Sequence, residues 1–470
     1  MATNDLFNKD LNVINIGLSS FKENIEEAGA HAVQVDWKPP AELDKKILNI
    51  LSENESFIKT QNKKCLEKIL NGAPVLIDLK PAIDVIPGMK KNMILHAGPP
   101  ITWDRMCGPM RGAIIGALKY EGLAKSQKEA ETLAASEKIE YSPCHEHNTV
   151  GPMAGIVSPS MPVFVLKNET FGNYAYCTMN EGLGKVLRYG AYSDEVIEKL
   201  KWMETVLYLA LKRAVKELGK VDLKNIIAQA LHMGDEVHNR NRAATSLLYR
   251  TIAPAVIKTN EKDVAIKVLE FINGNDHFFL NLSMPACKVT LDAARNIEGS
   301  SVVVAMTRNG TDFGLQLSGT GNQWFVGQAP IPEALFFPGY TKDDANRDIG
   351  DSSITETNGL GGFAIASSPA IVQFVGGAAK DALNYSQEMY EITTGENNMY
   401  QIPALNFRGT PTGIDVIKVM EKGILPFIDT GVAHKKPGVG QVGAGVLSAP
   451  LEPFKKALYG FVQSLDKKKK

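Results

Sequence analysis

The chain has 470 residues, of which 44% are hydrophobic and 22% charged, so it can bury large cores in two or three domains. Lys and Arg together number 51 and Asp and Glu 52, which gives a formal net charge of −1. This balance argues against nucleic acid or an anionic membrane surface as the main partner.

Five cysteines are scattered along the chain without any Cys-x-x-Cys pair, the pattern expected of reduced thiols in a cytosolic protein. The first residues show no basic stretch followed by an apolar core, and no run of about eighteen apolar residues occurs. We therefore predict a cytoplasmic protein with no secretory signal and no membrane partner.

The N-terminal segment predicts a strand–helix–strand unit. Leu11–Gly17 and His31–Trp37 are apolar-rich strand candidates, and Phe21–Ala28 between them has a helical pattern. The turn after the first strand can present backbone N–H groups to an anion. It contains one glycine where the Gly-x-Gly-x-x-Gly fingerprint needs three, so no dinucleotide cofactor is predicted. Val75–Leu79 and Met93–Ala97 are further short strands.

Two arginines lie close to the start of the next predicted helix, which ends at Tyr120. Arg105 and Arg111 there oppose the helix dipole, at a cost of roughly 0.3–1 kcal/mol each when exposed. An anion held between them would account for this placement. Pairing with Asp104 or Glu121 accounts for it equally well.

A short segment rich in metal-ligand residue types follows. On an extended strand His145 and His147 would face one side, and Cys144 and Glu146 the other. Zinc needs at least three protein ligands, and no His-Glu-x-x-His signature is present. We therefore predict no metal, and His145 and His147 are the first candidates if one binds. A metal-free role, or hydrogen-bonded core histidines, is the alternative.

A Gly-x-Gly-Lys core ending at Lys185 resembles a phosphate loop. Met179 stands where a Walker loop needs glycine, however, and Val186 stands where it needs the Mg²⁺-binding hydroxyl. The segment is therefore no nucleoside-triphosphate loop. Asn180, Lys185 and Arg188 could still line an anion pocket at a turn.

The densest polar cluster is His232–Arg242, which lies between apolar helical stretches. Asp222 can cap the helix before it, and Gly234 can end that helix. We expect Asp235 to cap a second helix that begins at once, so that His238 and Arg242 share one face.

Two interpretations of this cluster stay open. One is a charged surface around a helix–helix corner. The other, which we favour, is a site for a small polar anion. Arg240 and Arg242 would supply charge, His238 would handle a proton, and Asn239 and Asn241 would bind a planar carbonyl or amide.

From Phe278 onward the sequence favours β structure. Ser301–Met306 and Phe313–Leu317 flank an Asn-Gly pair that predicts a hairpin. The glycine-rich segments 346–362 and 429–445 are candidate anion sites, although acidic residues in the first could instead bind a cation. His434 in the second is a candidate anion-binding residue.

These patterns together predict a multidomain α/β fold. The expected parts are a Rossmann-like α/β domain (1–135), a mixed α/β segment packing with the C-terminal part (136–192), a helical domain (193–275) and an α+β domain (276–470).

Five motifs together resemble the bacterial YlbE/YahG-like family, which is similar to the AllG-type component of oxamate carbamoyltransferase. The motifs are Val150-Gly-Pro-Met-Ala-Gly155, Asn180-Glu-Gly-Leu-Gly-Lys-Val-Leu-Arg188, Met233-Gly-Asp-Glu-Val-His-Asn-Arg-Asn241, Asp348-Ile-Gly-Asp351 and Asp429-Thr-Gly431. The resemblance covers nearly the whole chain. It implies phosphorolysis of oxalurate, or a related ureido acid, to oxamate and carbamoyl phosphate in allantoin and purine breakdown. It also implies an acyl-CoA-synthetase-like (FdrA-like) partner subunit, and we expect a homo-oligomer.

The family resemblance supplies no residue roles, so those we assign come from chemistry. The motifs of single-chain carbamoyltransferases, Ser-Thr-Arg-Thr and His-Pro-x-Gln, are absent. The predicted catalytic residues are His238, His147, Asn239 and Asn241. The predicted substrate- and anion-binding residues are Arg240, Arg242, Arg105, Arg111, Lys185, Arg188, Asn180 and His434. Alternatives are a non-catalytic scaffold or regulatory subunit, and a metal-dependent amidohydrolase using His145, His147 and a carboxylate.

Overall fold

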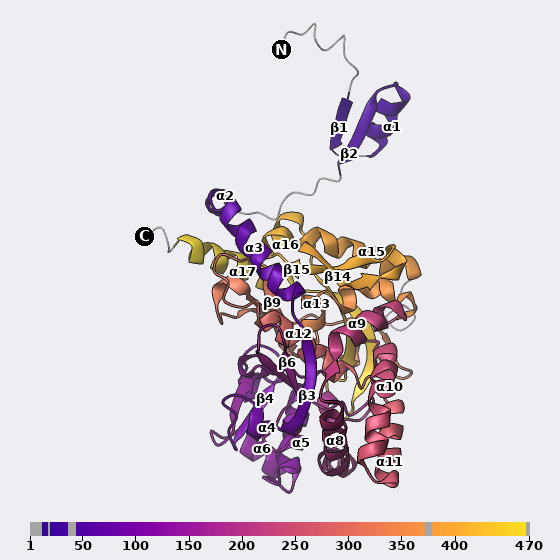
Figure 1. Cartoon of the computed structure of the whole chain (residues 1–470). Helices are drawn as coiled ribbons and strands as arrows, with labels where there is room; N and C mark the ends of the chain where they lie inside the picture. The colour runs from indigo at the N-terminus through magenta and orange to yellow at the C-terminus, as the bar shows by residue number, and fades with distance from the viewer. Residues whose placement is uncertain (1–11, 17–18, 36–43, 372–377, 467–470) are drawn as a thin grey trace.

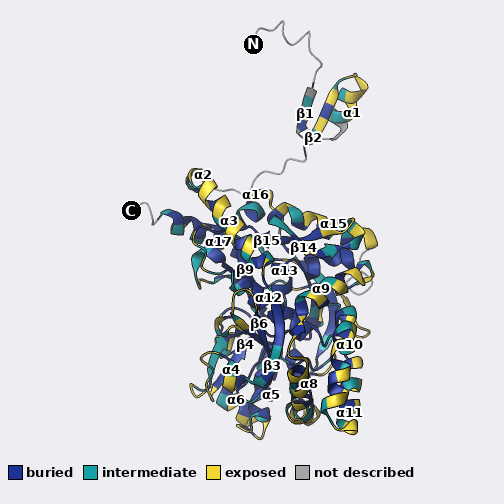
Figure 2. Ribbon diagram, in the orientation of Figure 1, coloured by how far each residue is buried: buried dark blue, intermediate teal, exposed yellow. Residues whose placement is uncertain are grey.

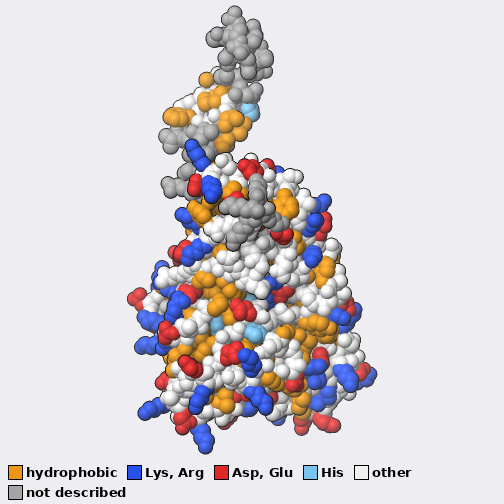
Figure 3. All heavy atoms as spheres, turned by 90° about the vertical axis from the view of Figure 1, so that its left-hand side faces the viewer, with side chains coloured by type: hydrophobic (Ala, Val, Ile, Leu, Met, Phe, Trp, Pro, Cys, Tyr) orange, Lys and Arg blue, Asp and Glu red, His pale blue; other side chains and the backbone are white. Residues whose placement is uncertain are grey.

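The computed structural model describes residues 12–16, 19–35, 44–371 and 378–466, and within them the chain is a mixed α/β protein with six small sheets (Figure 1). No helix in these ranges is both long and apolar enough to cross a membrane. The predicted α/β class is confirmed. Basic and acidic side chains are interspersed over the face in Figure 3, in line with the nearly neutral net charge.

The N-terminal unit has the predicted strand–helix–strand order. Strand β1 (Asn12–Ile16) pairs in parallel with β2 (His31–Val35), and α1 (Ser19–Glu27) connects them. Parallel strands are normally buried on both faces, but Ile14 and Val33 are 69% and 49% exposed. The unit thus shows apolar surface. Gly17, the glycine of the predicted anion-binding turn, lies outside the described residues.

An antiparallel sheet in the order β7–β6–β3–β8 runs through the lower half of Figure 1. Its strands are β3 (Pro74–Pro81), β6 (Pro162–Asn168), β7 (Tyr174–Thr178) and β8 (Val221–Asp222). Beside it, β4 (Met93–His96) pairs in parallel with β5 (Glu140–Pro143), and α5 (Gly108–Tyr120) and α6 (Gln127–Ala134) lie in the connection.

The strand pairing of β3 differs from a Rossmann-like arrangement. β3 is antiparallel to both of its neighbours, so it does not join the parallel β4–β5 pair. The physical reason is the long β3–β6 ladder, in which the partner strand is almost wholly buried. Residues of the predicted segments 1–135, 136–192 and 193–275 therefore share one sheet, and the domain boundaries stay predictions.

Helices dominate the segment predicted to be helical and continue past it. They are α7 (Asp194–Trp202), α8 (Tyr208–Leu218), α9 (Leu223–His232), α10 (Arg242–Thr259), α11 (Lys262–Asn273) and α12 (Leu280–Asp292), with a π-helical turn at Met203–Leu207. The expectation of β structure from Phe278 is wrong, because α12 occupies that stretch. Its residues 280–291 are all buried, so its apolar character reflects a central helix.

The remaining elements build the C-terminal part and its N-terminal cover. The helices are α2 (Lys45–Glu53), α3 (Glu55–Leu70), α13 (Ile354–Thr357), α15 (Ala379–Met389), α16 (Val416–Lys422) and α17 (Leu451–Asp466). The short α4 (Ala82–Val85) instead packs against β3 and β6. One sheet has the spatial order β11 (Phe325–Gln328), β10 (Asp312–Leu317), β9 (Val303–Asn309) and β13 (Ile349–Gly350). A second has the order β12 (Glu333–Phe336), β17 (Gln441–Ser448) and β16 (Phe427–Ala433). The third pairs β14 (Thr393–Ile402) with β15 (Arg408–Ile414). The Asn-Gly hairpin between β9 and β10 is confirmed, with Gly310 at a φ of +82°.

Buried residues form a continuous interior around α12 and β9, shown in dark blue in Figure 2. All five cysteines are free thiols, as predicted. Helix α13 contacts both α12 and β9, so the buried Asp348–Asp351 motif just before it lies against this interior.

Candidate functional site: a buried histidine–carboxylate cluster

The loop before α10 is shaped by its own carboxylates. As predicted, Asp222 caps α9 by accepting the Asn225 N–H at 3.0 Å, and Gly234 follows the helix with a φ of +84°. The predicted start of the next helix at Asp235 is wrong, because α10 begins at Arg242. Asp235 nevertheless caps that helix from a distance, since one of its oxygens accepts the first-turn N–H groups at 2.8 and 3.1 Å.

Glu236 holds the centre of this loop. Its carboxylate accepts the backbone N–H of His238 at 2.6 Å and also that of Arg240. Val237, which lies between Glu236 and His238 in the chain, has a φ of +65°. Residues branched at Cβ rarely adopt this conformation. The two bonds to Glu236 fix a tight turn that directs the His238 side chain into the protein.

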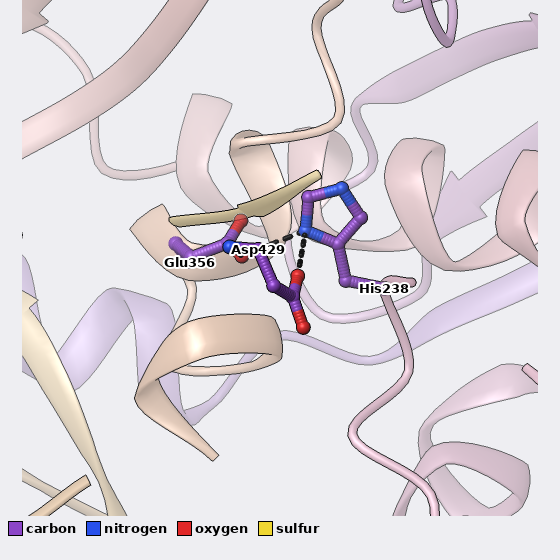
Figure 4. Close-up of side chains that lie close together, drawn as sticks. All are labelled: His238, Glu356 and Asp429. Carbon is purple, nitrogen blue, oxygen red and sulfur yellow. Dashed lines mark hydrogen bonds and ion pairs between the residues drawn. The ribbon is translucent and has the colours of Figure 1, made fainter. Parts of the chain in front are cut away.

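His238 faces two carboxylates from distant parts of the chain (Figure 4). Its Nδ1 lies 2.7 Å from Glu356 Oε1 and 2.9 Å from Asp429 Oδ1. Glu356 comes from α13 and Asp429 from β16. The His238 side chain is 4% exposed and both carboxylates are fully buried. The Gly362 N–H orients Glu356 Oε1 from 3.0 Å, whereas neither Asp429 oxygen receives a hydrogen bond.

The protonation of this cluster follows from burial and mutual attraction. Burial alone would lower the pKa of His238, but the charges of Glu356 and Asp429 outweigh it and raise that pKa to about 10. Burial raises the pKa of Asp429 to about 6, against the opposing pull of His238. The pKa of Glu356 is lowered, because His238 more than offsets its burial. In the protein alone the centre is thus a histidinium beside a carboxylate.

Asp235 and Glu236, which precede His238 in the chain, are buried next to it. Burial raises the pKa of Asp235 to about 7. The pKa of Glu236 is raised well above its usual range by burial and by repulsion from Asp429 and Asp235. The cluster therefore contains four buried carboxyl groups around one imidazole. Among the described residues, ligand atoms of His238, Glu356 and Asp429 lie within 4.8 Å of one another and could hold a metal ion.

A buried arginine joins this cluster to a second family motif. Arg308 on β9 contacts Asp348 through Nε at 2.5 Å and through a second nitrogen at 3.1 Å. It also donates to Gly350 O at 2.9 Å and to Thr430 Oγ1 at 3.2 Å. Since Thr430 follows Asp429 in β16, this network fixes the strand that carries the carboxylate.

Asp351 ties the Val150–Gly155 motif to the same network. Its carboxylate accepts the N–H groups of Gly98 and Gly151 at 2.9 and 3.0 Å, and a hydrogen bond from Thr307. Burial raises its pKa to about 6. Asp348 and Asp351 of the predicted glycine-rich anion or cation segment 346–362 therefore bind groups of the protein itself.

The Asn180–Arg188 segment contacts Asn275 and Asn281, at and just before α12. Burial, followed by the positive charges of Arg188 and His238, lowers the pKa of His277 to about 3. Arg188 is buried and donates to Gly182 O at 2.6 Å. Asn180 is buried and donates to Asn281 Oδ1 at 2.6 Å.

The residues next to His238 take different positions. Asn239 and Arg240 are half-buried, and Arg242 is exposed with Asp276 at 3.7 Å. Asn241 is buried and donates to the His238 carbonyl, while its own Oδ1 has no hydrogen-bond partner. The predicted helical face shared by His238 and Arg242 is absent, because a loop separates them.

Three predicted anion-binding residues lie elsewhere. Arg105 pairs with Asp312 at 2.8 Å, and Arg111 donates to the Asp104 carbonyl at 2.7 Å. Lys185 is exposed. The structure does not bring these three side chains to the His238 cluster.

His434 belongs to a surface turn. Its Nδ1 accepts the Lys436 N–H at 2.9 Å, and its Nε2 lies 3.6 Å from Asp344 Oδ1. Both partners come from the chain's own loops, so the ring holds the turn after β16 together.

His145 and His147 lie on a 3₁₀ turn, Cys144–His147, and not on a strand. The His147 ring contacts Pro87 O at 2.6 Å and Ser142 Oγ at 2.8 Å. The buried His145 ring has no hydrogen bond, and its Nε2 is 3.6 Å from Asp351 Oδ1. The expectation that both rings share one face is wrong, because the turn sends them to different neighbours.

An open polar pocket of about 600 Å³ lies beside His145. Arg295 contributes a guanidinium that is 14% exposed and donates to Asn322 Oδ1 at 2.9 Å. Buried oxygens of Asp292 and Asn173 there lack hydrogen bonds. The lining residues are His145, Glu146, Asn148, Asn173, Tyr174, Asp292, Arg295, Asn296 and Asn322.

Several key residues were not among the predicted site residues. Glu356 is 118 residues from His238 in sequence, and Asp429 is further still. Both stand in segments singled out for their glycines, and the only local signal was an acidic residue beside a glycine turn. Arg308 and Arg295 carried no signal beyond their charge.

Comparison with known proteins places this fold and site. The fold is that of a crystal structure of a conserved protein of unknown function from Enterococcus faecalis V583, with a TM-score of 0.86, 48% sequence identity, and coverage of 87% of this chain and 98% of that chain. A family model described as oxamate carbamoyltransferase subunit AllG matches residues 139–352. The chain belongs to the AllG family, as the motifs predicted.

Two curated relatives from Escherichia coli (strain K12) support this assignment. The uncharacterized protein YahG is 46% identical over 97% of this chain and 98% of its own length. The oxamate carbamoyltransferase subunit AllG is 43% identical over 86% of this chain and 97% of its own length.

Proposed function

We propose that this chain is a subunit of a carbamoyltransferase that phosphorolyses oxalurate, or a related ureido acid, to oxamate and carbamoyl phosphate. The observation that carries the proposal is its 43% identity to the AllG subunit over 97% of that protein. The chain would act with an acyl-CoA-synthetase-like (FdrA-like) partner subunit and as a homo-oligomer. Because YahG is also similar, the substrate class we commit to is the ureido acids.

The reaction sets clear chemical needs. A phosphate oxygen attacks the carbamoyl carbon, the carbon–nitrogen bond to the oxamate nitrogen breaks, and that nitrogen takes up a proton. Two anions must therefore be held together while negative charge builds on the carbamoyl oxygen. Arginines and asparagine amides suit these groups through bidentate contacts and hydrogen bonds. Arg240 and Asn239, which follow His238 in the chain and are half-buried, are the candidates to supply them.

The polar pocket supports binding of a small acid with an amide. Arg295 can bind a carboxylate, and the amides of Asn148, Asn173 and Asn322 can pair with a ureido group. The unpartnered oxygen of Asp292 can accept an N–H. The pocket is therefore a second candidate site for the ureido acid, separate from the residues around His238.

The test is carbamoyl phosphate formation from oxalurate and phosphate by the complex of this chain with its partner subunits. We expect Arg295→Ala and Arg240→Ala to lower kcat/KM by at least about tenfold, because each removes a charged contact. Arg213→Ala is the matched control, since that side chain lies on α8 and pairs with Asn260. Unchanged rates in both test variants would remove these arginines from the site.

A second candidate is a non-catalytic scaffold or regulatory subunit. It is favoured by the 4% exposure of the His238 side chain and by the exposed apolar residues of the N-terminal unit. It requires that cluster variants disrupt assembly on a sizing column and that any surviving complex keeps full activity. No contact favours an amidohydrolase built on His145 and His147, because their rings have different surroundings.

A further inference from the structure

We propose that His238, Glu356 and Asp429 form a binding site for one divalent transition-metal ion, of the Mn²⁺ or Zn²⁺ class. The three side chains come from a loop, a helix and a strand, and they converge in the interior of the protein (Figure 4). This inference goes beyond the proposed function, and its test needs no substrate.

The distances suit an ion better than a hydrogen bond alone. One imidazole nitrogen carries one proton at most, yet His238 Nδ1 lies within 2.7 and 2.9 Å of two separate carboxylate oxygens. Ligands bonded to an ion at about 2.1 Å and at right angles to each other are about 3 Å apart. The two contacts therefore match two edges of a coordination polyhedron. All three ligand atoms lie within 4.8 Å of one another.

Asp429 supplies an independent observation. Its side chain is fully buried, and neither of its oxygens receives a hydrogen bond. Buried carboxylates in proteins are paired, hydrogen-bonded or bound to a metal. Its Oδ1 has one charged contact, the His238 nitrogen that it shares with Glu356, and its buried Oδ2 has no hydrogen-bond partner.

The carboxyl groups around His238 also favour a cation there. Asp235, Glu236, Glu356 and Asp429 are all buried. The buried Arg308 is already engaged by Asp348 in a bidentate contact. A divalent ion at His238 would neutralise carboxylates that a single imidazole leaves uncompensated.

The ligand set decides the class of ion. Mg²⁺ and Ca²⁺ prefer all-oxygen shells, whereas an imidazole nitrogen with carboxylates suits Zn²⁺ and Mn²⁺. The ligands are pre-positioned, because Gly362 N–H orients Glu356 and the Glu236 carboxylate fixes the backbone of His238. Such support from neighbouring groups is what holds ligands in place at metal sites.

The experiment measures metal content of the purified full-length chain. The chain is stripped with chelator, dialysed against Zn²⁺ or Mn²⁺ at micromolar concentration, and analysed by elemental mass spectrometry. We expect one ion per chain for the wild type, and loss of it in His238→Gln and Asp429→Asn. His232→Gln and Asp194→Asn alter exposed side chains and should keep the ion.

Wild-type protein without a stoichiometric ion, or a His238→Gln variant that still holds one, would overturn the proposal. Because a protein with a substitution at a buried residue can fail to fold, metal binding is also measured on the wild type alone. Metal must raise its Tm in proportion to the logarithm of free metal concentration, and an unchanged Tm contradicts the site. Either failure leaves the carbamoyltransferase assay as a separate question, since metal content is measured without turnover.

Discussion

The Arg308–Asp348 pair offers the sharpest test of how the family motifs hold the site together. Asp348→Asn removes the negative charge but keeps the shape of the side chain. Arg308 would then retain its charge at 0% exposure, with only Gly350 O and Thr430 Oγ1 as other partners. Leaving one member of a buried ion pair uncompensated costs about 3–5 kcal/mol. We expect the free energy of unfolding to fall by that amount.

The matched control is an exposed pair of similar length. Arg408 and Glu396 lie 2.7 Å apart with side chains 48% and 34% exposed, and exposed pairs contribute about 0–1 kcal/mol. Glu396→Gln should therefore change stability by less than about 1 kcal/mol. The comparison separates the effect of burial from the effect of removing a charge.

Urea unfolding followed by far-UV circular dichroism measures both variants. The double variant Arg308→Met with Asp348→Leu should lose less free energy of unfolding than the two single variants lose in total. The reason is that the double variant leaves no unpaired buried charge. An Asp348→Asn variant within about 1 kcal/mol of the wild type would refute the reasoning. It would mean that water or another group reaches Arg308.

Three further predictions test packing, protonation and thiol burial. A Cβ at Gly98, where φ is +89°, would lie 2.5 Å from the Asn309 backbone nitrogen, so Gly98→Ala should lower Tm far more than Gly122→Ala, which has φ of +71° and open space. Burial lowers the pKa of His96 to about 4. Below about pH 6.5 His96 therefore binds a proton in the unfolded state but not in the folded state. The free energy of unfolding falls by about 1.4 kcal/mol per pH unit from there towards pH 4. His96→Gln should remove this slope in urea titrations, and an unchanged slope would contradict the burial of a neutral ring. Native protein should react slowly with a thiol reagent and show five thiols once denatured, since all five cysteines are free.

Local patterns predicted most of the secondary structure. The β9–β10 hairpin followed from its Asn-Gly turn, and α9 followed from its Asp222 cap and its Gly234 end. Helix α12 was missed, because its fully buried, non-periodic sequence resembles a buried strand. The loop before α10 was predicted to be helical because Asp235 was expected to cap a helix that starts at once. Asp235 does cap α10, but a turn that Glu236 stabilises lies between the cap and the helix.

The candidate site was predicted only in part, and the reason is sequence distance. His238 was identified from its polar neighbours in the sequence. Glu356 and Asp429 reach His238 only through tertiary packing, which no local periodicity encodes. Arg105 and Arg111 had the residue types of an anion site, but their partners are other parts of the chain.

We propose that the His238 cluster of this chain serves carbamoyl transfer. The most direct measurement is the rate of phosphate-dependent carbamoyl phosphate formation from oxalurate, comparing assembled complexes that contain wild type or His238→Gln at equal subunit ratio. We expect the rate to fall at least about a hundredfold with assembly intact. A variant complex that assembles normally and works within twofold of the wild type, a margin of about 0.4 kcal/mol, would contradict it.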